Sequence, residues 1–243
     1  VLRQRGQELG VFFEAEWKRG QSFLEDEKGI IPGDPNRGES TVAVLRTGAD
    51  YLLRLQRRAI AARITANFGI DALDATDNSE DEEFSDGEFV TGLFQIQLVE
   101  YLPWYGLRLQ SRLDAQVADG DLLGLEQFAI GGHATVRGFR ENLVVRDEGV
   151  VGSLELRIPL PLVDPIERLE FGVFTDVGYG RYLDQPDSLA ATLVSLGIGV
   201  HADITRYVRA SIEWAADLKE SGARTGNELQ DDGLHFSLQV RFP

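Results

Sequence analysis

The 243-residue chain contains no cysteine and no methionine. Without cysteine it has no disulfide, thiol nucleophile or cysteine-ligated zinc site. Its apolar runs are far shorter than the roughly 20 residues of a membrane helix, so we expect neither such a helix nor a secretory signal peptide in these residues. Basic residues number 24 against 40 acidic ones, and the net charge of -16 argues against a nucleic-acid partner, which would require a basic face.

The first residue is Val1, whereas a natural reading frame begins with Met. We therefore expect residues 1–243 to be the C-terminal portion of a longer protein, with preceding strands missing. Much of the acidic excess lies between Asp71 and Glu88. Clustered like charges repel one another, so this stretch is predicted to be a solvated loop.

Alternation of apolar and polar residues is the main structural signal. In Leu234–Phe242 every second side chain is apolar, while His235, Ser237, Gln239 and Arg241 share the opposite face. Comparable alternation predicts about ten strands in all, the others lying at 9–19, 41–56, 59–70, 89–102, 107–117, 150–160, 169–182, 191–205 and 208–217. Several exceed the mean of ~5–6 residues for strands of soluble proteins and reach the ~9–11 residues of a tilted membrane-spanning strand.

Periodicity alone does not separate a soluble β-sandwich from a membrane β-barrel, since both have one apolar and one polar face. The connections favour the barrel, because long ones alternate with short ones as outer loops alternate with periplasmic turns. The long connections are Gln21–Ser40, Asp71–Glu88, Asp119–Gly149, Asp184–Ser188 and Lys219–Asp232, and the short ones lie near Gln56–Ala59, Pro103–Gly106, Pro161–Arg168 and Asp203–Tyr207. Aromatic residues near strand ends fit interfacial girdles, although aromatic residues also end strands in soluble proteins. They are Trp17, Trp104, Tyr105, Tyr179, Tyr182 and Tyr207.

The connection Asp119–Gly149 is long and has little strand character. Connections of this length in compact domains are usually functional or disordered. This one contains many apolar residues and a Gly131-Gly132 pair, so we expect it to be ordered and to fold inward, with Gly131 and Gly132 as its hinge. Its centre is Val136-Arg137-Gly138-Phe139.

Two motifs carry a resemblance to a known family. Residues 125–140, which contain Val136-Arg137-Gly138-Phe139, resemble the signature loop of the ShlB/FhaC/HecB family, the TpsB transporters of two-partner secretion. That family has a second motif, F-x-D-x-G, which appears here as Phe174-Thr175-Asp176-Val177-Gly178. Both occur in the family's order with one strand between them, and residues 227–242 resemble the family's C-terminus. The resemblance covers residues 105–243 well and residues 1–104 weakly.

The resemblance implies an all-β fold, a transmembrane antiparallel β-barrel of the roughly 16-stranded type whose loop tip folds into the lumen. Its POTRA domains and first strands would not be present in residues 1–243. The expected location is the outer membrane of Gram-negative type, with lipid around a monomeric barrel. The expected partner is a secreted exoprotein, which the barrel would export and activate. An alternative in the same superfamily is an insertase that assembles other barrels, and a third reading is a barrel fused to an exported passenger or enzyme domain.

The residues themselves predict how the two motifs meet. On the strand at 169–180, Asp176 and Gly178 fall on the polar face, which would line the lumen. Glycines leave room for a loop to lie against the wall. The planar guanidinium of Arg137 can bind a carboxylate through two hydrogen bonds, so we predict an Arg137–Asp176 pair that holds the tip.

Other chemistry finds little support in the sequence. Gly131-Gly132 is followed by no Gly-Lys-Ser/Thr sequence, so it is no phosphate-binding loop. His133, His201 and His235 are too dispersed in sequence for metal-ligand spacing. No G-x-S-x-G motif occurs and no carboxylate pair is marked as a general acid. We therefore expect no cofactor, no metal and no enzyme activity.

Overall fold

The alternating segments form an antiparallel sheet in the computed structural model, which describes residues 2–4, 6–21, 23–24, 27–28, 39–76, 87–161, 164, 166–183, 189–219 and 232–242. The sheet has eleven strands in the order β1-β2-β5-β6-β7-β8-β11-β12-β13-β14-β15. Their bounds are β1 (Leu2–Gln4), β2 (Gln7–Gln21), β5 (Glu39–Arg54), β6 (Arg58–Ile70), β7 (Phe89–Tyr101), β8 (Arg108–Ala118), β11 (Glu148–Pro159), β12 (Arg168–Arg181), β13 (Ala191–Thr205), β14 (Val208–Lys219) and β15 (Leu234–Val240). The predicted strands are thus confirmed, and the short β1 is an addition.

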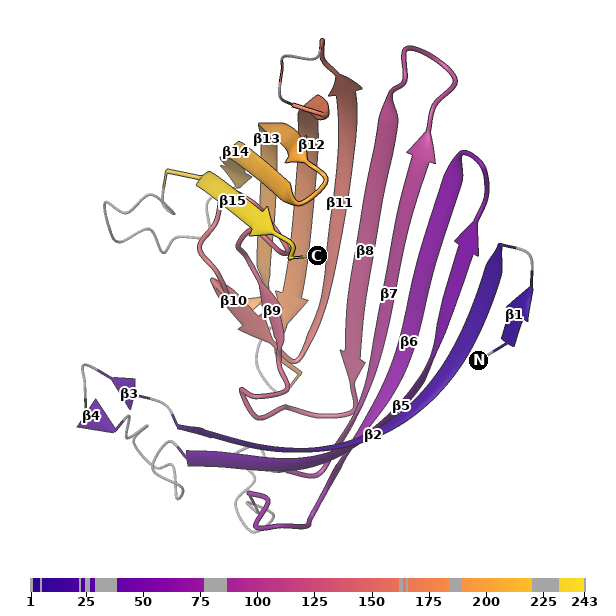
Figure 1. The fold of residues 1–243 in the computed structure, drawn as a ribbon. Coiled ribbons are helices and arrows are strands. Elements are labelled where there is room, and N and C mark those ends of the chain that lie inside the picture. Colours follow the sequence, from indigo (N-terminus) through magenta and orange to yellow (C-terminus); the bar gives the residue numbers. More distant parts are fainter. Residues whose placement is uncertain are drawn as a thin grey trace.

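Two small strand pairs lie outside this sheet. The pair β3 (Phe23–Leu24) and β4 (Glu27–Lys28) belongs to the connection between β2 and β5. The pair β9 (Phe128–Ile130) and β10 (Val144–Arg146) belongs to the connection between β8 and β11. Figure 1 shows β9 and β10 on the concave side of the curved sheet, which we call the lumen side. The inward folding predicted for residues 119–149 is therefore observed.

The two faces of the sheet differ as a barrel wall requires. On β12, Val173, Val177 and Tyr179 are 38%, 47% and 40% exposed on the convex face, whereas Phe174 and Asp176 are only 1% exposed on the lumen side. The ladder register carries this alternation to the neighbouring strands, because Asp176 lies opposite Ser153 on β11 and Ser195 on β13. An exposed apolar outer face with a polar inner face is the pattern of a membrane β-barrel.

Long and short connections lie at opposite ends of the strands, as predicted. The short connections β5–β6, β7–β8, β11–β12 and β13–β14 lie at one end, and the connection from β8 to β11 lies at the other (Figure 1). The other long connections fall largely outside the described residues, as does most of the acidic stretch between Asp71 and Glu88. The residues concerned are 22, 25–26, 29–38, 77–86, 184–188 and 220–231.

The described part of the sheet is not closed, since β1 and β15 are its two edges and do not pair with each other. β15 ends at Val240, two residues before the predicted end of the last strand. Several predicted girdle aromatics are exposed: Trp17, Trp104, Tyr105 and Tyr179. Across the described ranges, we find no helix with the length and apolar character needed to cross a membrane.

The orientation of the wall can be tested on β7. Phe94 is 40% exposed on the outer face, and its neighbour Gln95 is on the lumen side, where its amide lies 3.4 Å from Asp114. Phe94→Arg should lower the free energy of unfolding in lipid vesicles by about 2–4 kcal/mol, because it places a charge in hydrocarbon. Gln95→Arg, the matched control, gains Asp114 as a partner and should change stability little. Equal losses for both variants would contradict the assigned faces.

Candidate functional site

The loop between β8 and β11 returns on itself through β9 and β10. Ile130 pairs with Val144, Ala129 with Val145 and Phe128 with Arg146. This short ladder holds residues 131–143 as one projecting turn, whose centre is the sequence Val136–Phe139. We call these four residues the tip.

Gly131 and Gly132 begin this turn with φ values of 113° and 98°, which L side chains rarely adopt. A Cβ on Gly131 would lie 2.6 Å from the carbonyl oxygen of Arg140, and one on Gly132 would overlap the carboxylate of Glu141. Thr135 Oγ1 accepts a hydrogen bond from Gly131 N at 2.8 Å, and Gly132 N donates to Val136 O at 3.1 Å. The two glycines therefore form a compact, hydrogen-bonded turn, and their role as a hinge stays a prediction.

Arg137 and Asp176 lie together in the lumen, in the paired arrangement suggested by the two motifs. The Arg137 Nε atom donates to Asp176 Oδ2 at 2.8 Å, and Nη2 donates to Asp176 Oδ1 at 2.9 Å. The backbone amide of Arg137 adds a third bond to Oδ2 at 3.1 Å. Ser153 Oγ also donates to Asp176 Oδ1, at 2.6 Å. Such bidentate, charge-assisted pairs are the strongest hydrogen bonds available to these side chains.

Two further carboxylates hold the same guanidinium, and sequence reasoning did not assign them to it. Arg137 Nη1 donates to Glu155 Oε2 at 2.8 Å and to Glu213 Oε1 at 3.2 Å. The three acidic partners come from β12, β11 and β14, so one loop side chain connects three strands of the wall. Although burial opposes the charged form, Asp176 and Glu155 outweigh it and raise the pKa of Arg137, which keeps the guanidinium charged.

Three carboxylates around one guanidinium leave an excess of negative charge, which other cations reduce. Arg157 Nε donates to Glu155 Oε1 at 2.6 Å. His201 Nε2 lies 3.1 Å from Glu155 Oε1 and 3.6 Å from Glu213 Oε1. His133 Nδ1 lies 3.1 Å from Glu213 Oε2, and this carboxylate raises the pKa of His133 above its ordinary value of 6.5. Arg157, together with His133 when it is protonated, therefore reduces the net negative charge of the cluster.

Phe174, the first residue of the F-x-D-x-G motif, lies beneath the guanidinium. The Arg137 Cζ atom is 3.3 Å from the centroid of the Phe174 ring. Arg137 and Phe174 are 7% and 1% exposed, so the contact is almost dry. A cation over an aromatic face is attracted by the ring quadrupole, by about 2 kcal/mol when water is excluded. The F-x-D-x-G motif thus supplies both the carboxylate that pairs with Arg137, from Asp176, and the aromatic ring on which its guanidinium lies, from Phe174.

Glycine at position 178 allows the loop to touch the wall. A Cβ on Gly178 would overlap Ile130 Cγ2 and lie 2.9 Å from Val136 Cγ2. Ile130, Val136 and Phe139 are buried in one apolar cluster together with Val151 and Leu193 of the wall. The loop is therefore held by apolar packing at its base and by ion pairs at its tip.

Gly138 brings the tip against β14 and β15. Its φ is 92°, and a Cβ there would lie 3.1 Å from the Ala215 Cβ. The Gly138 amide donates to His235 Nε2 at 3.4 Å. Each of the four tip residues is buried, and each contributes either apolar packing, an ion pair or close backbone approach.

The three histidines are dispersed in sequence but gather around the tip, which spacing could not indicate. The rings of His133 and His235 lie with their centroids 5.7 Å apart and their planes tilted by 41°, and His201 contacts Glu155 and Glu213. Ligand atoms of Glu155, His201 and Glu213 lie within 4.8 Å of one another, as in a metal site. However, Arg137 and Arg157 bind the same carboxylates, and their positive charges oppose a metal cation at that position.

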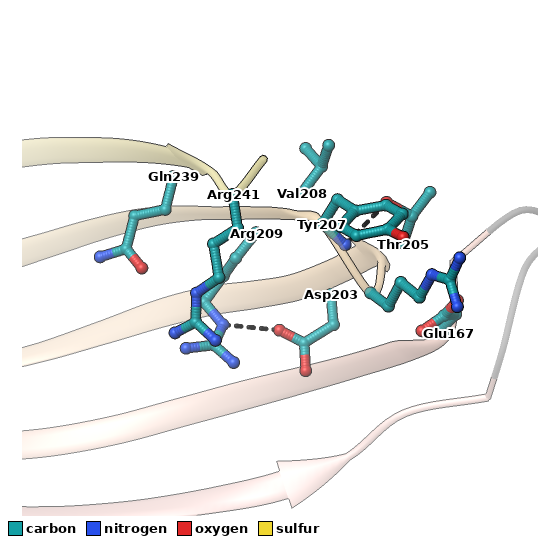
Figure 2. A pocket seen from close by; sticks show the side chains of 9 residues that line it. Glu167, Asp203, Thr205, Tyr207, Val208, Arg209, Gln239 and Arg241 are labelled. Atoms are coloured by element: carbon teal, nitrogen blue, oxygen red, sulfur yellow. Dashed lines mark hydrogen bonds and ion pairs between the residues drawn. The ribbon is translucent and has the colours of Figure 1, made fainter. Parts of the chain in front are cut away.

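Hollows in the described part of the molecule lie along the lumen wall. One of about 420 Å³ is beside the tip and is lined by Gln97, Arg112, His133, Ala134, Arg137 and Glu213, among others. Another, of about 520 Å³, lies over β2, β5, β6 and β7 and also reaches Gln97. A smaller one of about 150 Å³ lies near the β13–β14 turn, where Arg209 pairs with Asp203 at 2.7 Å beside Arg241 (Figure 2). The first two together describe an open space on the side of the loop facing β5–β8.

Comparison with known proteins decides which family has this arrangement. The sequence profile of the haemolysin secretion/activation protein family ShlB/FhaC/HecB matches residues 1–202. The chain belongs to this family. The match includes both motifs. It also covers residues 1–104, where the sequence itself showed only a weak resemblance, and it ends before β14. No curated protein sequence matches the chain.

Solved structures share the fold. CdiB from Escherichia coli superposes with a TM-score of 0.79 and 16% identity, over 99% of this chain and 43% of that one. CdiB from Acinetobacter baumannii superposes with a TM-score of 0.72 and 17% identity, over 99% of this chain and 40% of that one. BamA from Haemophilus ducreyi lacking POTRA domains 1–3 superposes with a TM-score of 0.63 and 12% identity, over 98% of this chain and 52% of that one. The chain thus spans less than half the length of either CdiB protein.

Family membership and fold together place this chain among the outer-membrane β-barrels of Gram-negative bacteria. The inward loop, the VRGF tip and the F-x-D-x-G strand are thus features of a barrel of this family.

The fit between loop and wall predicts the effect of enlarging Gly178. Gly178→Val should displace Ile130 and Val136, loosen the tip and make the bonds after Arg137 and Arg140 cleavable by trypsin in intact barrels. Gly152→Val is the control, because a Cβ there has its nearest atom at 3.4 Å and points to the outer face. If Gly178→Val is cleaved no faster than the native barrel at the same pH, the packing contact does not hold the tip.

The His133–Glu213 contact predicts a pH dependence of tip docking. Because the docked pKa of His133 is raised, its contribution is complete well below pH 6.5 and is lost as the pH rises through the raised value. The charged or titratable neighbours of His133 are Glu213, Glu141, Arg137 and His235. Tryptic cleavage at the tip should therefore rise between about pH 6 and 8 in the native barrel. His133→Gln should flatten that profile, and an unchanged profile would contradict the contact.

Proposed function

We propose that the chain forms the barrel of a two-partner (type V) secretion translocator, which exports and activates a partner exoprotein. The observation that carries this proposal is the VRGF tip, fixed inside the lumen by Asp176, Glu155 and Glu213. An insert that is anchored so firmly within a barrel is suited to controlling passage through it. We expect POTRA domains in the remainder of the protein to receive the unfolded exoprotein.

The lumen wall supports a path for an unfolded polypeptide of varied sequence. Most of its charges are paired across neighbouring strands, as Arg63 is with Asp50 at 2.5 Å and Arg54 with Glu8 at 3.0 Å. Charges that are already paired attract a passing segment only weakly. Surface ion pairs of this kind contribute only about 0–1 kcal/mol each to the stability of the barrel. Of the predicted mixed-charge wall residues, Arg108, Arg112, Asp114, Glu155, Arg157, Arg209 and Glu213 all have ion-pair partners.

The direction of transport would come from the exoprotein. No ATP is available at the outer membrane, so the barrel supplies the path and folding of the exoprotein outside prevents its return. The tip would hold the pore in a competent state, with Gly131 and Gly132 permitting its conformation. Lipid would surround a monomeric barrel, and neither nucleic acid nor a cofactor would take part.

An insertase that assembles other outer-membrane barrels is the second candidate. The likeness to BamA, with a TM-score of 0.63, favours it specifically. The two functions differ in how many proteins depend on the barrel. Deleting an insertase would disturb many outer-membrane proteins, whereas deleting a translocator would stop the secretion of one partner.

Secretion of the partner exoprotein tests the translocator proposal. Arg137→Ala removes a guanidinium from three buried carboxylates, and losing one partner of a buried pair costs about 3–5 kcal/mol. We expect its secretion to fall at least roughly tenfold while the barrel still inserts. Arg63→Ala is the control, because its pair with Asp50 lies on the opposite part of the wall.

A charge exchange adds detail to this test. Arg137→Asp combined with Asp176→Arg should not restore secretion, because the carboxylate introduced on the tip would face Glu155 and Glu213. Normal secretion by Arg137→Ala would refute the role of the tip. Restoration by the exchange would show that Asp176 is its only important partner.

A further inference from the structure

The loop has a second attachment, far from its tip, that the family motifs do not include. Glu126 lies just before β9, and its side chain is only 5% exposed. Arg46 Nη2 donates to both oxygens of Glu126, at 2.9 and 3.0 Å, and Lys18 Nζ donates at 2.9 Å. Arg46 also pairs with Glu16 at 2.9 Å. One loop carboxylate is therefore held by two cations, from β2 and β5.

Apolar packing surrounds this ion cluster. Leu122 and Leu123 are buried against Val42 and Val44 of β5 and against Phe89 of β7. The neighbouring Leu125 lies over Gly20 of β2, where a Cβ would be 2.7 Å from Leu125 Cδ2. We call residues 122–127 the arm. Its contacts form an apolar core separate from the one beneath the tip.

Asp147 fastens the arm to the end of the loop. It is fully buried and accepts hydrogen bonds from Leu122 N at 3.0 Å, Gln127 Nε2 at 2.8 Å and Leu183 N at 3.0 Å. Gln116 Nε2 donates to the carbonyl oxygens of Glu126 and Asp147, at 3.0 and 3.1 Å. The arm is therefore fixed both to the wall and to the strand end that follows the loop.

The two attachments lie on different parts of the wall. The arm contacts β2 and β5, near one edge of the sheet, whereas the tip contacts β11, β12 and β14, near the other. In Figure 1, β2 and β5 sweep beneath β9 and β10 at the end where the loop lies. The loop therefore spans the lumen from one region of wall to another, and moving the tip alone would not clear it.

We propose that Glu126, bound by Lys18 and Arg46, is a positioning residue that makes the loop a brace across the lumen and sets the resting width of the pore. This proposal rests on the proposed function, since it takes the lumen to be a transport path. Glu126 does not touch the cluster around Arg137 in the described structure. It acts by fixing the arm from which the β9–β10 hairpin and the tip project.

The conductance of the purified full-length protein in planar lipid bilayers tests this brace. Glu126→Arg would confront Lys18 and Arg46 with a third cation, so the arm should detach and the resting conductance should rise severalfold. Arg46→Glu should have the same effect through repulsion from Glu16 and Glu126. Combining Glu126→Arg with Arg46→Glu re-forms a pair of opposite charges and should return the conductance to the native value.

Two controls separate positioning from general damage to the barrel. Glu8→Arg breaks the lumen-facing ion pair with Arg54 at 3.0 Å, on the same two strands but at the end of the short turns, and should leave conductance unchanged. Each variant should still migrate as a folded barrel in SDS gels without heating. Unchanged conductance in Glu126→Arg, or failure of the charge exchange to restore it in a folded barrel, would overturn the proposal.

This test is independent of the exoprotein. If Glu126→Arg opens the pore although no partner is secreted, the brace stands and the proposed function fails. If Arg137→Ala abolishes secretion while Glu126→Arg leaves conductance unchanged, the proposed function stands and the brace fails.

Discussion

The burial of one guanidinium determines how the loop sits in this barrel. A charged group with 7% exposure must be paired, and Arg137 finds its partners on three strands of the wall. Asp176, Glu155 and Glu213 are themselves nearly buried, so withdrawal of the tip would remove the guanidinium from all three and leave only Glu155 with an arginine partner, Arg157. The ion cluster therefore favours one docked position for the tip, in which the guanidinium meets all three carboxylates.

Ion pairing alone would not bring the loop against the wall, because the loop must also fit there sterically. Gly178 leaves space for Ile130 and Val136, and Gly138 lets the tip lie against Ala215. The same strand, β12, presents Val173 and Val177 outward and Asp176 inward. Because side chains alternate along β12, one face of the strand is apolar and points outward, and the other face contacts the loop. The F-x-D-x-G motif therefore has its aromatic residue, its acid and its glycine at alternate positions, all on the face that contacts the loop.

The sequence allowed the strands, the two faces and the inward loop to be predicted, because period-two alternation is a local property. The juxtaposition of Arg137 with Asp176 followed from the family motifs and from the face on which Asp176 falls. Glu155, Glu213 and the three histidines could not be assigned, since carboxylates are abundant and their meeting depends on strand register. The contact of Glu126 with Lys18 and Arg46 joins residues about a hundred positions apart and left no local signal.

We infer that the docked tip borders a path for polypeptide. Ala134 is exposed beside the tip and lines the hollow that reaches Gln97. A photo-crosslinking residue placed at Ala134 in cells, with the exoprotein arrested in transit, tests this most directly. We predict an adduct with the exoprotein from this position and none from Leu154, which is 47% exposed on the outer face. No adduct from Ala134, or equal adducts from both positions, would contradict the account.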